Sequence, residues 1–342
     1  MKSYFSKPCG AVLGRQSDFL DKNALLVEKS AKATEALLRA PLREKCTLCA
    51  SRPSAENFLH RGAPYFMCAT CGQVQTLNDS ALVDWDPEQY AQVYPELSPE
   101  ARQERMNSIY TPKLDWMLEA SQAQLEISQE QLFSKKWLEV GCGEGLFLEA
   151  LRDKGAAQIG GIDVDDHMVE RCCQLLGENC VEKSQNTIHD VVRVKKFDVL
   201  IAWYVLEHIF ELDLLSKSLS QLPSGTLFCF AVPMYGFSSI LESAVVQHYS
   251  RTLDNSVHTQ LFTDESIDYF LDKSGFSKAA QWVFGQDVAD LGRVFSLGLA
   301  EHYPGYLADA FNEKFTAAFD EIQQTLDGHF LSDSRHILAV KK

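Results

Sequence analysis

The sequence predicts an α/β protein with a doubly wound, mostly parallel sheet and a small cysteine-rich module in front of it. Two observations carry this prediction. From residue 137 onward, short apolar strands alternate with amphipathic helices, a pattern typical of a parallel sheet that is covered on both faces. Before that region, four cysteines form two matched pairs, "CTLC" and "CATC".

Length and composition restrict the class of protein. A chain of 342 residues is long enough for about two domains, and 46% hydrophobic with 23% charged residues is ordinary for a globular protein. The 32 Lys and Arg against 47 Asp and Glu give a formal charge of −15, which disfavours broad contact with nucleic acid phosphates. The longest central apolar run, "VLIAWYVL" at 199–206, is too short to span a membrane. The N-terminus lacks the features of a signal or transit peptide, so we expect a cytoplasmic location.

The chain before the α/β region divides into three predicted segments. A helix is expected at 23–40, where the apolar periodicity stops at Pro41, and a second helix at about 99–130. The predicted division is a helical N-terminal extension, a cysteine module, a helical connector and an α/β domain, covering residues 1–44, 45–80, 81–134 and 135–342.

The cysteine pairs have the spacing of a metal site. Their pattern, C-x2-C-x18-C-x2-C, fits a zinc ribbon in which four thiolates hold one ion, and Gly72 suits the tight turn after the second pair. Four sulfur ligands leave no open position, so the zinc is predicted to be structural. The alternatives are unpaired buried thiols or a single redox pair. The predicted ligands are Cys46, Cys49, Cys68 and Cys71.

Within the α/β region the elements follow one another in a regular order. Helices are expected to end at Gly155 and Gly177, and a helical periodicity continues over 205–222. The expected strands are "KWLEV", "QIGGIDV", "CVEKS", "FDVLIAW" and "GTLFCFAVP".

The first strand runs into a loop with glycine at alternate positions, Gly141, Gly143 and Gly145. Such a loop lets a ligand approach the backbone closely. A dinucleotide fingerprint needs a further glycine where this chain has Leu146, so no pyrophosphate is indicated. Asp163 closes the next strand, where a carboxylate can accept both hydroxyl protons of a ribose. These residues predict a nucleoside-like ligand.

Taken together, these motifs resemble the class I S-adenosylmethionine-dependent methyltransferase family. The matching segments are "LEVGCGEG" (138–145), "GIDV" (161–164), "FDVLIAWYVLEHI" (197–209) and "HTQLFTDESIDYFLDKSGF" (258–276). The resemblance implies a Rossmann-like methyltransferase fold with a seven-stranded sheet, whose last strand is antiparallel and formed by residues 335–342.

The resemblance also implies S-adenosylmethionine as the cofactor and a set of contacts with it. Glu139 and the glycine loop would hold the methionine end, Asp163 the ribose, and the loop around 184–186 the adenine. The expected cofactor contacts are Glu139, Gly141, Cys142, Gly143, Gly145, Asp163, Val164, Ser184, Gln185, Ala202 and Trp203.

The combination of a zinc ribbon with this domain resembles bacterial methyltransferases of sugar-nucleotide and polysaccharide pathways. The resemblance favours a small-molecule acceptor, a sugar or sugar nucleotide, methylated on oxygen or carbon. Candidate substrate contacts are Tyr90, Tyr94, Tyr204 and His258.

The segment "VLEH" carries the candidate catalytic residues. It places Glu207 and His208 after the fourth strand of the domain, at the edge of the sheet where ligands bind in open α/β folds. A histidine titrates near neutrality, so His208 is a candidate general base for an alcohol or carbon acid, with Glu207 orienting it. Neighbouring helical residues point about 100° apart, so the alternative is that one of the two only caps or packs.

Two functions of other classes stay open. One is an RNA-modifying methyltransferase whose zinc ribbon binds RNA; the net charge disfavours it, as does "AWYV" at 202–205 in place of an Asn/Asp-Pro-Pro-Tyr motif. The other is a non-catalytic protein that binds S-adenosylmethionine.

Overall fold

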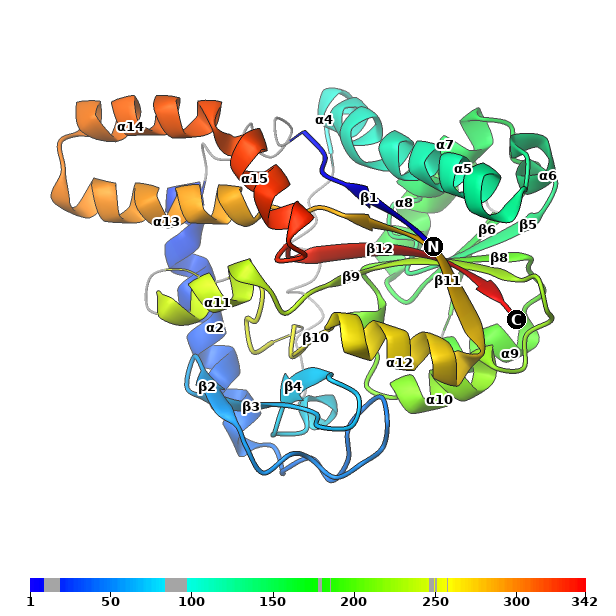
Figure 1. Ribbon diagram of the computed structural model, residues 1–342, viewed down its shortest axis with the longest axis horizontal. Coiled ribbons are helices and arrows are strands. Elements are labelled where there is room, and N and C mark those ends of the chain that lie inside the picture. The colour runs from blue at the N-terminus through cyan, green and yellow to red at the C-terminus, as the bar shows by residue number, and fades with distance from the viewer. Residues whose placement is uncertain are drawn as a thin grey trace.

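The structure, a computed structural model, has an eight-stranded sheet as its central element, with helices on both faces (Figure 1). It describes residues 1–8, 19–83, 97–177, 180–184, 186–245, 249, 251–256 and 258–342. The strand order is β1-β11-β12-β9-β8-β5-β6-β7. The strands are β1 (Lys2–Phe5), β5 (Lys136–Val140), β6 (Gln158–Asp163), β7 (Val181–Lys183), β8 (Val199–Trp203), β9 (Leu227–Pro233), β11 (Phe276–Val283) and β12 (Ser334–Lys341).

The order and direction of the strands confirm the predicted fold class. All of the pairings are parallel except those of β12, which runs antiparallel to both β11 and β9. The expected last strand is therefore present. The sheet has eight strands instead of the expected seven, because Lys2–Phe5 adds an edge strand parallel to β11. Four residues are too short a segment for a periodicity of two to be recognised in the sequence.

Helices cover the two faces of the sheet with separate apolar cores. On one face lie α5 (Thr111–Leu125), α6 (Gln129–Phe133), α7 (Leu146–Asp153) and α8 (Asp166–Leu176). On the other lie α9 (Ile188–Val194), α10 (Leu212–Leu219) and α12 (Asp264–Ser274). Apolar residues at helical spacing in α7 and α10 face these cores, which is the pattern that identified them in the sequence.

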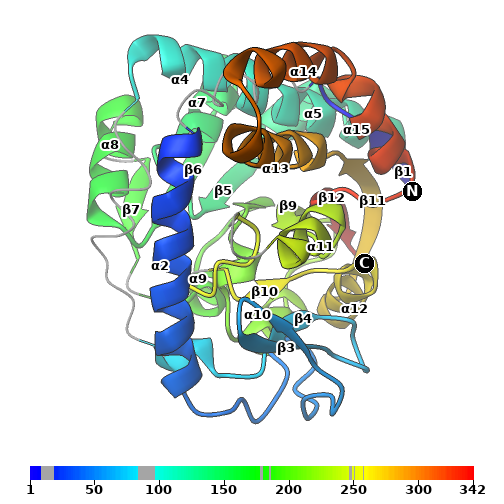
Figure 2. The same ribbon diagram turned by 90° about the vertical axis from the view of Figure 1, so that its left-hand side faces the viewer.

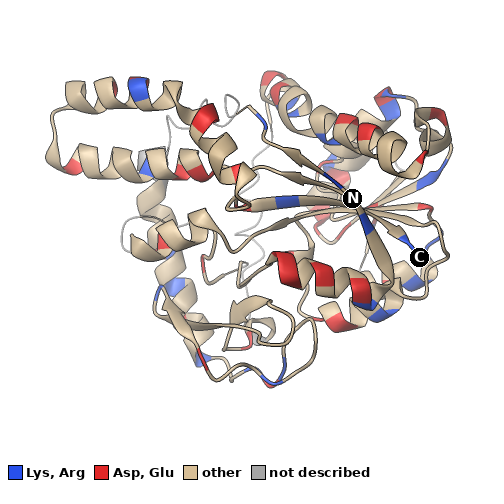
Figure 3. Cartoon of the chain, viewed as in Figure 1, with Lys and Arg blue, Asp and Glu red and all other residues tan. Residues whose placement is uncertain are grey.

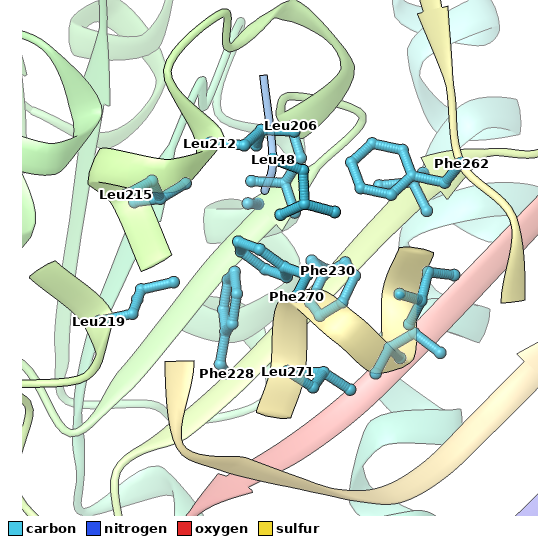
Figure 4. Close-up of a cluster of buried hydrophobic side chains, with 14 of the residues drawn as sticks. Leu48, Leu206, Leu212, Leu215, Leu219, Phe228, Phe230, Phe262, Phe270 and Leu271 are labelled. Atoms are coloured by element: carbon cyan, nitrogen blue, oxygen red, sulfur yellow. The ribbon is translucent and has the colours of Figure 1, made fainter. Parts of the chain in front are cut away.

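The cysteine module packs below α10 and α12 and is joined to the α/β domain by a strand. Its small sheet has the order β10-β4-β3-β2, with β2 (Phe58–His60), β3 (Ala63–Met67), β4 (Val74–Thr76) and β10 (Gln260–Leu261). The last of these strands comes from the second half of the chain and pairs antiparallel with β4. Leu48 of the module lies in the same core cluster as Leu206 and Leu212 (Figure 4).

Other helices lie outside the two layers. α2 (Phe19–Arg39) runs along one side of the molecule (Figure 2). α13 (Asp287–His302) and α14 (Gly305–Ala317) form an antiparallel pair at the end of the sheet opposite α6 (Figure 1). Acidic residues mark the outer side of α12 (Figure 3). In the described part of the chain, no helix combines the length and apolarity needed to cross a bilayer. The remaining helices are α4 (Pro99–Arg105), α11 (Phe237–Ala244) and α15 (Phe319–Gly328).

Candidate functional site

A cavity of about 820 Å³ opens at the carboxyl ends of β5, β6 and β8. Ligands of doubly wound sheets bind at this edge. Eight of the predicted cofactor residues line the cavity, together with His208 and Tyr204. The eight are Glu139, Gly141, Cys142, Gly143, Asp163, Val164, Ser184 and Trp203.

The glycine loop has the backbone that its sequence predicts. All three glycines have φ between +52° and +79°, which other residues rarely adopt. A Cβ at Gly141 would lie 2.6 Å from Val205 Cγ2, and one at Gly145 would overlap Cys172 Sγ. Only at Gly143 does a Cβ meet no described atom within 4 Å. The outer two glycines therefore serve the packing of the loop, and Gly143 is the one of the three that borders open space in the cavity.

Asp163 ends β6 with its carboxylate held against the loop. Oδ2 accepts a hydrogen bond from Gly143 N at 2.8 Å, and Oδ1 accepts one from Asp165 N at 3.0 Å. The side chain still lines the cavity, although only 6% of the residue is exposed. Each carboxylate oxygen keeps a free lone pair, which suits the acceptance of ribose hydroxyl groups.

Glu139 and Lys113 form the charged floor of the cavity. Burial raises the pKa of the Glu139 carboxyl well above its usual range, and Glu139 Oε2 has no hydrogen-bond partner among the described residues. The pKa of Lys113 is lowered to about 7, mainly by burial; the charge of Lys7 also lowers this pKa, and Glu139 raises it. Both shifts favour the neutral forms, because the charged carboxylate and ammonium are costly in the cavity unless a ligand pairs with them.

Aromatic rings surround the Lys113 ammonium. Its Nζ lies 4.8 Å from the ring centroid of Trp203, 5.3 Å from that of Tyr204 and 5.5 Å from that of Tyr110. These cation–π contacts stabilise the charge without consuming its three N–H donors. The zwitterionic methionine end of S-adenosylmethionine has the complementary ammonium and carboxylate, so the residues present fit this cofactor.

Three predicted cofactor residues are not among these eight. Gly145 and Ala202 are next to cavity residues in the sequence but do not line the cavity, and Ala202 is fully buried inside β8. Among the eight, Val164 is 73% exposed at the rim. Ser184 N donates to Asp163 O at 2.9 Å, which ties the loop after β7 to the end of β6. Gln185 lies outside the described residues.

The predicted catalytic pair lies on a short turn. Leu206–His208 form a single 3-10 turn between β8 and α10, separate from the helix in which the periodicity placed them. Glu207 is 1% exposed, and burial raises its pKa to about 8. Tyr204, just before the turn, has φ of +56°, a left-handed conformation that costs roughly 1–2 kcal/mol in a bulky residue. Its hydroxyl lies 2.6 Å from Ser334 Oγ.

The structure brings His258 to the same turn. Its ring stacks on that of His208 with centroids 5.2 Å apart, and donor atoms of Glu207, His208 and His258 all lie within 4.8 Å of one another. Carboxylate and imidazole are also ligands of divalent cations, so the cluster could hold such an ion as well as move a proton. Of the predicted substrate contacts, Tyr204 lines the cavity and His258 does not, whereas Tyr90 and Tyr94 lie outside the described residues.

The four predicted zinc ligands converge at the base of the cysteine module. Cys46 Sγ lies 3.6 Å from Cys71 Sγ, and Cys49 Sγ lies 3.5 Å from Cys68 Sγ. A tetrahedron with zinc–sulfur bonds of about 2.3 Å has sulfurs about 3.8 Å apart, so the donor set fits zinc. Gln75 Nε2 donates to Cys46 Sγ at 3.1 Å, and the hydrogen bond with Cys71 lowers the pKa of Cys46, so a thiolate is favoured there.

Sequence reasoning missed several cavity residues that come from the connector. The cavity is also lined by Arg105 at the end of α4, Tyr110 at the end of the π-helix Met106–Tyr110, and Lys113 in α5. A single lysine beside a proline carries no spacing signal, and only its burial in the fold distinguishes it from a surface lysine. The sign that the sequence offers is the polar segment "YTPK" (110–113), which interrupts the apolar face of the predicted connector helix.

The fold and the cavity define a class I S-adenosylmethionine-dependent methyltransferase domain. Residues 85–281 match the family described as "Methyltransferase domain", which is more than half of the 342 residues. The chain belongs to this family.

The chain is similar to several named methyltransferases. It is 26% identical over 156 residues to the human mitochondrial ubiquinone biosynthesis O-methyltransferase, covering 43% of this chain and 42% of that protein. It is 36% identical over 107 residues to the ubiquinone biosynthesis O-methyltransferase of Actinobacillus pleuropneumoniae, covering 28% and 45%. These matches span less than half the length of the curated relatives. Among solved structures, magnesium protoporphyrin IX methyltransferase from Synechocystis with bound S-adenosylhomocysteine is 14% identical, with 75% and 94% coverage and a TM-score of 0.45.

Proposed function

We propose that this chain transfers a methyl group from S-adenosylmethionine to a hydroxyl group of a small molecule. The observation that carries the proposal is the cavity floor, where a buried glutamate with an oxygen that has no described partner and a lysine surrounded by aromatic rings share the cavity with Gly143. The curated relatives are O-methyltransferases by name, which supports oxygen as the methylated atom.

The residues of the floor have distinct roles in holding the cofactor. Glu139 binds its ammonium group, and Lys113 binds its carboxylate. Asp163 accepts the ribose hydroxyls, and Ser184 and Asn186, which both line the cavity, lie beside the adenine. The opposite charges of Glu139 and Lys113 fix the direction in which the methionine end enters, so the reacting methyl is oriented before an acceptor arrives.

We assign catalysis to the Leu206–His208 turn after β8. S-adenosylmethionine, when bound, would supply a sulfonium methyl group that an acceptor oxygen attacks in line, with S-adenosylhomocysteine as the leaving group. His208 lines the cavity and takes the proton that the acceptor hydroxyl loses. Glu207 is the neighbouring group that we assign to orienting the imidazole, since one of its oxygens is within 4.8 Å of a His208 nitrogen. We assign structural zinc to the four cysteines, with no part in the chemistry.

The acceptor class follows from the resemblance and from the relatives. A sugar or sugar nucleotide is the acceptor that the combination of zinc ribbon and methyltransferase domain favours. A small phenol is the second candidate, because ubiquinone biosynthesis is named in the curated relatives. Nucleic acid is disfavoured by the charge of −15.

Turnover with an acceptor panel tests the proposal. Purified protein is incubated with S-adenosylmethionine and with sugars, sugar nucleotides or phenols in separate reactions, and S-adenosylhomocysteine and methylated product are measured by mass spectrometry. We expect both products in equal amounts with one acceptor class. Release of S-adenosylhomocysteine only with RNA would replace the small-molecule proposal, and binding without turnover across the panel would favour a non-catalytic protein.

A further inference from the structure

A single buried amide contacts the backbone of the catalytic turn. Gln260, the first residue of β10, is 1% exposed, and its Nε2 donates to Glu207 O at 2.8 Å and to Ile209 O at 2.9 Å. Both protons of the amide nitrogen are therefore used on the two carbonyls that flank His208. A one-turn 3-10 segment without a side-chain cap leaves such carbonyls unpaired unless another residue supplies donors.

The other end of this amide leads to the cysteine module. Gln260 Oε1 accepts from Thr47 Oγ1 at 3.1 Å, Thr47 N donates to Gln75 Oε1 at 3.1 Å, and Gln75 Nε2 donates to Cys46 Sγ at 3.1 Å. Thr47, Gln75 and Gln260 are each at most 3% exposed. The hydrogen bonds thus run without a break from a zinc-ligand sulfur to the turn that carries Glu207 and His208.

The network fixes the orientation of the glutamine. A flipped amide would place Oε1 against two carbonyl oxygens and leave the Thr47 hydroxyl facing a donor. A second bond, from Asp213 N to Thr47 O at 2.9 Å, joins the same threonine to the start of α10. Leu48 packs in one cluster with Leu206 and Leu212 (Figure 4), so polar and apolar contacts both hold the turn against the module.

We propose that Gln260 is a positioning residue for methyl transfer, which fixes the Leu206–His208 turn on the cysteine module. The inference rests on the proposed catalytic role of that turn. It gives the zinc ribbon a function beyond folding: through Thr47 and Gln260, the module holds His208 at the cavity. A cofactor bound on the floor by Glu139 and Lys113 makes no use of this network.

Local hydrogen exchange tests the inference without an acceptor. The reporters are the amides of His208 and Ile209, which bond to Val205 O and Leu206 O, compared with amides of β5 as an internal standard. We expect Gln260→Met to speed exchange in the turn by at least about tenfold and Thr47→Val, which removes one link, by roughly threefold. Gln281→Met is the control, because Gln281 is a buried glutamine that bonds to Ser3 on the far edge of the sheet.

Two further readouts separate positioning from general destabilisation. The dissociation constant of S-adenosylhomocysteine should stay within about twofold of wild type, with one site per chain. With an acceptor from the panel, Gln260→Met should lower kcat about tenfold with the KM for S-adenosylmethionine unchanged. Unchanged exchange in the turn, or equally faster exchange in β5, would overturn the role of Gln260. If the wild-type protein bound no S-adenosylhomocysteine, the proposed function would be overturned instead. The exchange result would still show whether Gln260 holds the turn.

Discussion

The two sides of the cavity are built in different ways. Most of the cofactor side comes from one continuous segment, in which β5, the glycine loop, α7 and β6 place Glu139, Gly143 and Asp163 within 25 residues of one another, and Lys113 joins it from α5. The proposed acceptor side depends on segments from across the chain: the turn at Leu206–His208 reaches the cavity, and Gln260 and the cysteine module support that turn from behind. One side is a local motif, and the other is assembled by tertiary contacts.

The difference teaches where stability and function are coupled. The cofactor side forms once its strand–loop–helix unit folds, because its hydrogen bonds join residues that are at most 20 positions apart in the sequence. The acceptor side depends on the module, since the turn itself is a single 3-10 turn. Damage to the module should therefore impair transfer, whereas damage to the glycine loop should impair binding.

The largest effect is expected when the proposed zinc ligands of the module are removed. Cys46→Ser combined with Cys68→Ser should abolish zinc binding and cost more than about 4 kcal/mol of unfolding free energy, because metal loss also removes the hold on the turn. Elemental analysis and thermal unfolding measure both quantities. Cys180→Ser is the matched control, as Cys180 lies far from the ligand set in the sequence. Full zinc content in the double variant, or unchanged stability, would contradict the assignment.

On the acceptor side, His208→Asn should reduce kcat by a factor of about 10² to 10⁴, the usual contribution of a general base. The affinity for S-adenosylhomocysteine should not change, because the cofactor side does not depend on this imidazole. Steady-state kinetics with the identified acceptor measure the first quantity and calorimetry the second. His167→Asn, on the exposed face of α8, is the control. A loss smaller than about tenfold would remove His208 as the base.

On the cofactor side, Gly143→Val should weaken S-adenosylmethionine binding by at least about a hundredfold, since the side chain enters the only open position of the loop. Calorimetric titration checks this. Gly225→Val is the control: its φ is +85° with no atom near the new Cβ, so it has the same backbone strain without touching the cavity. Wild-type affinity in Gly143→Val would show that the loop does not hold the ligand.

The smallest effect concerns Lys113 and depends on pH. Lys113→Met should weaken S-adenosylmethionine binding roughly tenfold near pH 6, where the ammonium is charged. Burial lowers the pKa of Lys113 to about 7, so above that pH the free protein must take up a proton to bind a carboxylate. The wild-type advantage should therefore shrink as pH rises to about 9. Titrations at several pH values follow it, with Lys154→Met on the surface as control. A constant ratio of affinities would exclude this pairing.

How much the sequence could predict follows the same division. The strands β5 to β9, the glycine loop, Asp163 and the cysteine pairs are encoded by periodicity or fixed spacing, and each could be recognised within a short window. Lys113, Gln260 and the strands β1 and β10 have no such local pattern. Their roles arise from burial and from partners more than 50 residues away, which a single sequence does not display.

A crystal structure with bound S-adenosylhomocysteine tests the central claim most directly. The methionine ammonium should lie against Glu139, its carboxylate against Lys113 and its ribose against Asp163, with the sulfur facing the turn that carries His208. A ligand whose sulfur points away from that turn, or one bound outside the glycine-loop cavity, would contradict the proposed division into a cofactor side and an acceptor side.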